Sequence, residues 1–173
     1  MTKRGTRPLY SLATFLKFLA RSTNRHGLHS PFVFAFVTQG LQRGPKLHGD
    51  RSLDVLFKSI RYFRAQRVCS IGEVSKKAVL ENYIPAPGPD RGPFDIIYTE
   101  GMDTAGLLVL LSRGALHNDS MVLVDKIHGD SQRERDWKAL AALPQISVSI
   151  DLFHCGALFV RREQEKEHFY IRI

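Results

Sequence analysis

The sequence predicts an α/β fold in which a mostly parallel sheet ends in an antiparallel hairpin. Two apolar segments, FDIIYTEG and SMVLVDKIHG, end on the acidic residues Glu100 and Asp125. Further on, ISVSIDLFHCGALFV holds two apolar runs turned around His154, Cys155 and Gly156, which favours a hairpin. Ligands of open α/β sheets bind at the carboxyl ends of strands, so Glu100 and Asp125 are the first candidate functional residues.

The N-terminal third is predicted to be helical. Apolar residues at helical spacing indicate an amphipathic first helix that packs on the domain: Leu9, Leu12, Phe15, Leu16 and Leu19. Ser30 before Pro31 is typical of a capped helix start, and this second helix is expected to run to about Leu41. A third helix is expected at about 52 to 65.

The first strand is expected at about 67 to 71, and a turn with the single glycine Gly72 follows it. Only residues 73 to 93 separate Gly72 from Phe94. A crossover between parallel strands takes a dozen or more residues. The interval therefore holds one short helix, near residues 74 to 83, and a loop, but not two further strands.

The rest of the chain continues the alternation of helices and strands. Asp103 and Thr104 are expected to cap a helix that ends near Gly114; because this helix is apolar almost all round, we expect it to be buried against the sheet. Ser131 and Glu134 match a capping box for a helix through Ala142 that Trp137 anchors to the sheet. The remaining strands are expected at about 120 to 125, 146 to 153 and 157 to 162, and the final HFYIRI is compatible with a short sixth.

Composition favours one compact unit. The chain has 173 residues, 43% of them apolar; residues 1 to 50 form a helical lead-in and residues 51 to 173 the sheet-bearing part of the same unit. Cys69, in a predicted strand, and Cys155, at the hairpin turn, do not make a disulfide framework, which favours a reducing, cytoplasmic location. No apolar run approaches the roughly 20 residues of a membrane span.

The order of these segments resembles that of a known enzyme family. HGLHSPFVFAFVTQ, from His26 to Gln39, is similar to the helical lead-in of a bacterial branch of the class I S-adenosylmethionine-dependent methyltransferases, and residues 24 to 72 and 94 to 173 match that branch in order. The resemblance implies a three-layer, Rossmann-like sheet with a final reversed strand. In that family a G-x-x-x-G turn and two more strands precede the counterpart of FDIIYTEG, so this chain is expected to lack the family's second and third strands.

The shortened interval has geometric consequences. A right-handed crossover from the first strand directly to FDIIYTE places the helix at 74 to 83 on the opposite face from the family's first helix. The first strand also becomes an edge of the sheet. Because an apolar edge invites pairing, either the N-terminal helices or a homodimer partner is expected to cover it.

The resemblance also implies roles for particular residues. If the chain is active, Glu100, Asp125 and His128 are the catalytic candidates, with His128 as general base; if S-adenosylmethionine binds, Gly72 and Glu73 contact it. Asp125 opens a segment similar to the family's D-D-x-H pattern, with Lys126 in place of the second carboxylate. Because an ammonium opposes cation binding, no metal is expected. Glu100 and Asp125 are alternatively expected to accept hydrogen bonds from backbone N–H groups at helix starts.

Other polar residues have simpler interpretations. His26 and His29 lie three residues apart but lack further ligands at metal-binding spacing, so packing at a helix entry is the expected role. Lys76 and Lys77 are expected to be solvated, with contact to an anion at a helix start as the alternative. Residues 1 to 67 hold 13 Lys or Arg against two acids, a net charge of +11 compared with +8 for the whole chain, which is compatible with solvated helix faces or with an anionic partner.

Three hypotheses follow. The first is a degenerate methyltransferase descendant that acts through interactions. The second is an active methyltransferase with a rebuilt or dimer-completed cofactor pocket, whose acceptor, by resemblance alone, is a small-molecule hydroxyl. The third is a nucleic-acid-binding protein that uses its basic N-terminal third.

Overall fold

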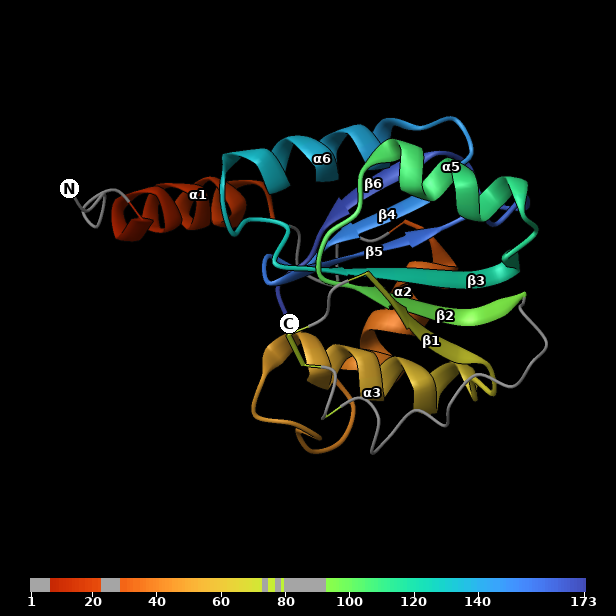
Figure 1. The fold of residues 1–173 in the computed structure, drawn as a ribbon. Helices are drawn as coiled ribbons and strands as arrows, with labels where there is room; N and C mark the ends of the chain where they lie inside the picture. The colour runs from red at the N-terminus through yellow and green to blue at the C-terminus, as the bar shows by residue number, and fades with distance from the viewer. Residues whose placement is uncertain (1–6, 23–28, 73–74, 77–78, 80–92) are drawn as a thin grey trace.

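A six-stranded mixed sheet forms the centre of the molecule (Figure 1). The computed structural model describes residues 7–22, 29–72, 75–76, 79 and 93–173, with side chains from residue 12 onward. Along the chain the elements are α1 (Arg7–Arg21), α2 (Pro31–Ala35), η2 (Phe36–Leu41), α3 (Arg51–Phe63), β1 (Val68–Ile71), β2 (Phe94–Thr99), α5 (Thr104–Ser112), β3 (Leu116–Asp125), α6 (Ser131–Ala142), β4 (Val148–Asp151), β5 (Cys155–Phe159) and β6 (Glu167–Tyr170).

The strand order is β1-β2-β3-β5-β4-β6. β1, β2 and β3 are parallel, as are β4 and β6, whereas β5 is antiparallel to both of its neighbours. The predicted α/β class, the mostly parallel sheet, the C-terminal hairpin and the sixth strand are therefore confirmed. β1 forms one edge of the sheet that the described residues make, as expected.

The hairpin turn differs from the prediction. Cys155 and Gly156 belong to β5, where Gly156 pairs with Val124 of β3 and with Asp151 of β4. The turn itself is formed by residues 152 to 154, and Phe153 has a φ of 69°. The prediction placed the turn on the glycine, but the reversal uses a non-glycine residue in the left-handed region instead.

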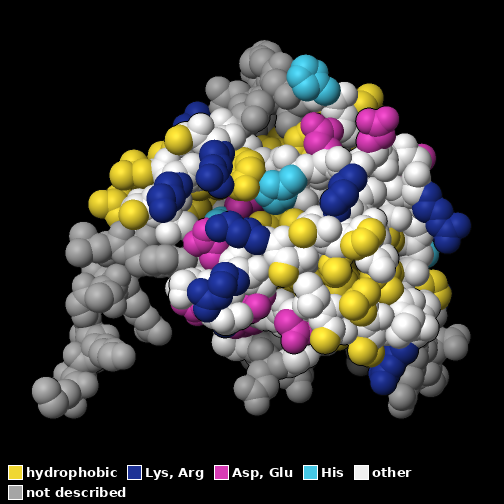
Figure 2. Space-filling view, turned by 90° about the horizontal axis from the view of Figure 1, so that it is seen from above, with side chains coloured by type: hydrophobic (Ala, Val, Ile, Leu, Met, Phe, Trp, Pro, Cys, Tyr) yellow, Lys and Arg dark blue, Asp and Glu magenta, His cyan; other side chains and the backbone are white. Residues whose placement is uncertain are grey.

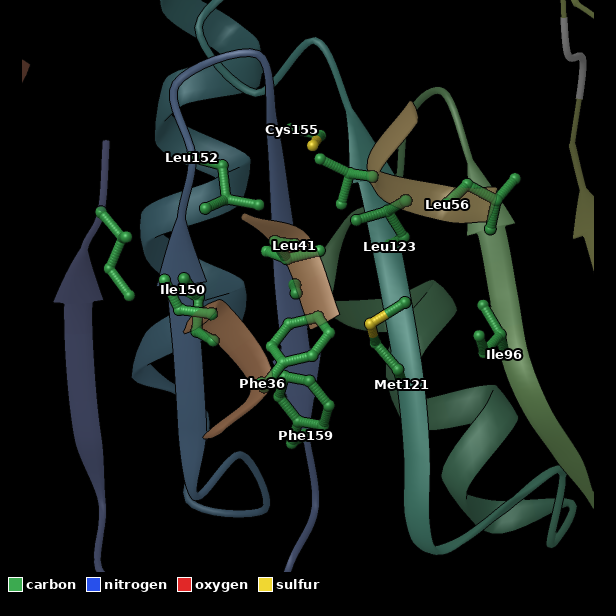
Figure 3. Close-up of a cluster of buried hydrophobic side chains, with 14 of the residues drawn as sticks. Phe36, Leu41, Leu56, Ile96, Met121, Leu123, Ile150, Leu152, Cys155 and Phe159 are labelled. Carbon is green, nitrogen blue, oxygen red and sulfur yellow. The ribbon is translucent and has the colours of Figure 1, made fainter. Parts of the chain in front are cut away.

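Helices cover both faces of the sheet, with α5 and α6 on one side and α2, η2 and α3 on the other (Figure 1). Each face has its own hydrophobic cluster. Figure 3 shows the cluster under the N-terminal helices, where Phe36 of η2 meets Phe159 of β5 with ring centroids 5.8 Å apart. Leu56 of α3 and Met121 of β3 belong to the same cluster. The N-terminal helices thus share one core with the sheet.

The N-terminal helices begin and end near the predicted positions. Ser30 caps α2 by accepting a hydrogen bond from the Val33 N–H at 3.4 Å, which confirms the predicted cap. Asp50 caps α3 by accepting from the backbone of Ser52 and Leu53. α1 projects from the end of the sheet (Figure 1) and contacts the domain through Phe15, whose ring lies 4.9 Å from that of Phe153.

Helix α5 is much less buried than expected. Asp103 caps it as predicted, and Leu107 is fully buried, but Leu108 and Val109 are 40% and 45% exposed. Hydrophobic side chains accordingly gather on the face seen in Figure 2. The prediction of burial was wrong because the sheet covers only one side of a helix, however apolar its other sides are.

Helix α6 begins at a different cap from the predicted one. Asp130, not Ser131, is the N-cap, and it accepts from the backbone of Gln132 and Arg133. Trp137 is buried, as predicted, and its ring lies so close to Gly156 that a Cβ at that position would overlap it. Glycine at position 156 is therefore what lets α6 lie against the hairpin.

Several predicted features lie outside the described residues. These are most of the predicted helix at 74 to 83, together with Glu73, Lys77 and His26. Among the helices that the structure describes, none combines the length and apolar character that crossing a bilayer requires.

Candidate functional site

The candidate carboxylates lie side by side at the carboxyl edge of the sheet. β2 and β3 are parallel, and Thr99 pairs with Val124, so the residues that follow them, Glu100 and Asp125, are neighbours. Both side chains are buried. The structure therefore brings together the two acids that the sequence predicted to converge.

Asp125 is surrounded by donors from four parts of the chain. Its Oδ2 accepts from the Tyr98 hydroxyl at 2.8 Å and from the Lys76 ammonium at 2.7 Å. Its Oδ1 accepts from the Ser52 hydroxyl and from the backbone N–H of Lys126. With four donors on two oxygens, this carboxylate is hydrogen-bonded to capacity by the protein itself.

Lys76 links two carboxylates. Its Nζ lies 2.7 Å from Asp125 and 2.9 Å from Asp50, and its side chain is only 16% exposed. Burial alone would lower the pKa of Lys76, but its bonds to Asp125 and Asp50 raise that pKa above its ordinary value. The expectation of a solvated Lys76 is therefore wrong.

Glu100 is neutralised by a second lysine. Its Oε2 accepts from Lys126 Nζ at 2.7 Å, and its Oε1 accepts from the Ser75 hydroxyl at 2.6 Å and from the Lys76 N–H at 3.2 Å. Burial opposes ionisation of Glu100, but the bonds from Lys126 and Ser75 lower its pKa below the ordinary value. Backbone N–H groups thus contribute to both sites, but they do not belong to the starts of described helices as expected, and side-chain donors predominate.

Tyr98 is a buried residue of β2 whose hydroxyl stays protonated. Burial raises the pKa of the Tyr98 hydroxyl, and the adjacent Asp125 carboxylate raises it further. The hydroxyl therefore remains a donor to Asp125 across the physiological range. Sequence reasoning missed Tyr98, although its place one residue before the end of a buried strand was a usable signal.

The described hydrogen bond of the His128 side chain is not to Asp125 but to another acidic residue at the end of a strand. Its Nε2 lies 2.7 Å from Oδ2 of Asp151, the last residue of β4. Its ring stacks on Phe153 at 5.3 Å, and its buried Nδ1 has no hydrogen-bond partner in the described part of the chain. His128, which the resemblance predicts as a general base if the chain is active, thus forms an imidazole–carboxylate pair, and Asp151 is the partner that the sequence did not reveal.

Two hollows open at this edge of the sheet. One, of about 560 Å³, lies beside Gly72, Thr99 and Gly101; the other, of about 450 Å³, is lined by Asp125, Lys126 and His128. Gly72 has a φ of +76°, which suits glycine. Each hollow falls in the size range of small-molecule sites.

The residues expected to contact S-adenosylmethionine are Gly72 and Glu73. Gly72 borders a hollow, but Glu73 lies outside the described residues. The Glu100 carboxylate is engaged by Ser75 and Lys126, so it has few lone pairs left for a ligand. In the described ranges, no group of three or more His, Cys, Asp or Glu is arranged to hold a metal ion.

Comparison of the chain with family models, with curated proteins and with solved structures found no match.

Proposed function

We propose that the chain is a methyltransferase-like protein with a reduced cofactor site, and that it acts by binding a partner rather than by transferring methyl groups. The sheet supports the first part of this proposal: β5 runs antiparallel between β3 and β4, the arrangement that the sequence resemblance implies for a final reversed strand. Fold alone does not establish activity, so the second part depends on the site.

The neutralisation of both strand-end carboxylates carries the proposal. Lys126 Nζ is paired with a carboxylate oxygen of Glu100, and Lys76 Nζ is paired with one of Asp125, each at an N···O distance of 2.7 Å. A methyl donor with a positive sulfonium would have to approach acids that already hold ammonium groups. Removing the Lys76 ammonium from the buried Asp125 carboxylate is costly, which favours a structural role for this pair.

Titration calorimetry with S-adenosylmethionine tests this proposal. We expect no saturable heat up to about 1 mM, which corresponds to a binding free energy weaker than about −4 kcal/mol. Adenosine serves as the matched control because it lacks the sulfonium and the amino acid part. Saturable binding of S-adenosylmethionine in the micromolar range, with adenosine inactive, would contradict the proposal.

A second candidate function rests on a different observation. The His128–Asp151 pair resembles the arrangement by which a carboxylate orients a general base, and the hollow beside Gly72 is large enough for a small ligand. An active methyltransferase with a rebuilt pocket is therefore the alternative. Micromolar binding of S-adenosylmethionine, lost on Gly72→Val but kept on Gly49→Ala, a glycine outside this hollow with open space around it, would favour this alternative.

A further inference from the structure

A third hollow, separate from the Gly72 side of the sheet, lies among α1, α3 and the β4–β5 turn. It has a volume of about 540 Å³. Phe15 and Phe18 of α1 line it from one side, and Leu152 and Phe153 of the turn line it from another. The two α1 rings lie 4.9 and 5.4 Å from the ring of Phe153. This hollow, the α1 groove, is thus lined largely by aromatic and aliphatic side chains.

Cations outnumber acids around the α1 groove. Lys46, Arg51, Lys58 and Arg172 line it, against the single side-chain carboxylate of Asp54. Lys58 is paired with Asp54 at 3.2 Å, and Lys46 and Arg51 add positive charge that no other acidic side chain lining the groove balances. In a groove walled by apolar groups, this surplus favours an anion.

Arg51 stands at the boundary between two hollows. Arg51, Phe153 and His154 line both the α1 groove and the hollow beside Asp125. The Arg51 guanidinium contacts Nε2 of His154 at 2.7 Å. Burial lowers the pKa of His154, and the charge of Arg51 lowers it further. A neutral imidazole accepts from Arg51, and the remaining guanidinium N–H groups of Arg51 can serve a ligand.

We propose that the α1 groove binds a free, single-chain amphiphilic anion. Its hydrocarbon chain lies against Phe15, Phe18 and Phe153, where burial of apolar area drives binding. Its anionic head lies at Arg51 and Lys46, because guanidinium and ammonium groups form strong charge-assisted bonds to carboxylates and phosphates. The site does not depend on methyltransferase ancestry, since none of these residues belongs to the Glu100–Asp125 cluster.

Titration calorimetry with ten-carbon probes below their micelle concentrations tests this inference. We expect saturable binding of decanoate or decyl phosphate, and binding of decyltrimethylammonium that is at least about tenfold weaker. The two anions distinguish a carboxylate ligand from a phosphate ligand. Equal binding of the cation and the anions, or no saturable binding of either anion, would overturn the inference.

Two pairs of variants locate the head and the chain. Arg51→Gln should weaken anion binding about tenfold, whereas Arg113→Gln, at the exposed end of α5, should leave it unchanged. Phe15→Ala should weaken binding, whereas Leu12→Ala should not, because Leu12 lies on the same helix and is 57% exposed.

An opposite pattern would overturn the inference. If Leu12→Ala rather than Phe15→Ala abolishes binding, the ligand contacts the outer side of α1, and a lipid surface becomes the better explanation. Co-sedimentation with vesicles of anionic phospholipid distinguishes this outcome, since the α1 groove predicts no dependence of vesicle binding on Arg51 or Phe15.

Discussion

Two buried aspartates at the same edge of the sheet are satisfied in different ways. Asp125, at the end of β3, is held by the Lys76 ammonium and the Tyr98 hydroxyl. Asp151, at the end of β4, is held by the His128 imidazole and the Phe153 N–H. Lysine keeps its charge over the physiological range, whereas imidazole is the side chain suited to proton exchange near neutral pH. The comparison indicates a structural role for the Asp125 cluster and leaves the Asp151 pair as the place where chemistry could occur.

Replacing Asp125 should have the largest effect on stability. Asp125→Ala leaves the partly buried Lys76 ammonium without one carboxylate and leaves Tyr98 and Ser52 without their acceptor. We expect the free energy of unfolding to fall by about 3–5 kcal/mol, measured by urea unfolding followed by circular dichroism.

Asp119→Ala is the matched control for Asp125→Ala. Asp119 pairs with Arg161 at 2.7 Å, but its side chain is 62% exposed, and a surface pair contributes at most about 1 kcal/mol. If the two variants lose the same stability, Asp125 is not the centre of a structural cluster and the comparison fails.

The two lysines should differ in their contribution. Lys76 is 16% exposed and bridges two carboxylates, whereas Lys126 is 44% exposed and serves one. Lys76→Met should cost about 2–4 kcal/mol because Asp125 is left buried without its cation. Lys126→Met should cost no more than about 1 kcal/mol. Urea unfolding measures both, and a larger loss for Lys126→Met would show that Glu100, not Asp125, dominates the cluster.

Acidification should affect His154 and Glu100 at different pH values, with the smallest change in stability. Burial, followed by the charge of Arg51, lowers the pKa of His154 from 6.5. The unfolded chain therefore takes up this proton first, and stability begins to fall below pH 6.5. Because the pKa of Glu100 is lowered in the folded state, the stability that its ionised carboxylate contributes is lost at a lower pH, starting below pH 4.5.

Thermal unfolding between pH 8 and about pH 2 measures this difference. His154→Gln should remove part of the decrease that starts below pH 6.5, and His29→Gln, a change at an exposed histidine, should not. If the unfolding temperature does not change between pH 7 and pH 5, protonation of His154 does not destabilise the folded state.

The sequence predicted those features that depend on local pattern. Apolar runs located the strands, and Ser30 and Asp103 marked helix starts, because a capping side chain acts within three residues of itself. Local pattern failed where two caps competed, as at Asp130 and Ser131. It also failed for α5, since hydropathy records that a surface is apolar but not which side another element covers.

The site was only partly predictable for a related reason. Glu100 and Asp125 could be placed together from strand order alone. Their partners could not, because Lys76 reaches Asp125 across 49 positions of sequence and Ser52 reaches it across 73. The charge of the basic N-terminal third is likewise visible in the sequence, and binding of nucleic acid by that region stays a prediction.

The contact between Trp137 and Gly156 gives the molecule a built-in spectroscopic reporter. The chain has one tryptophan, and its indole is buried where α6 meets β5. Its emission must therefore shift to longer wavelength when that helix leaves the hairpin, whatever happens elsewhere. The packing of α6 on the sheet during refolding can thus be followed with the natural chain, without an added dye.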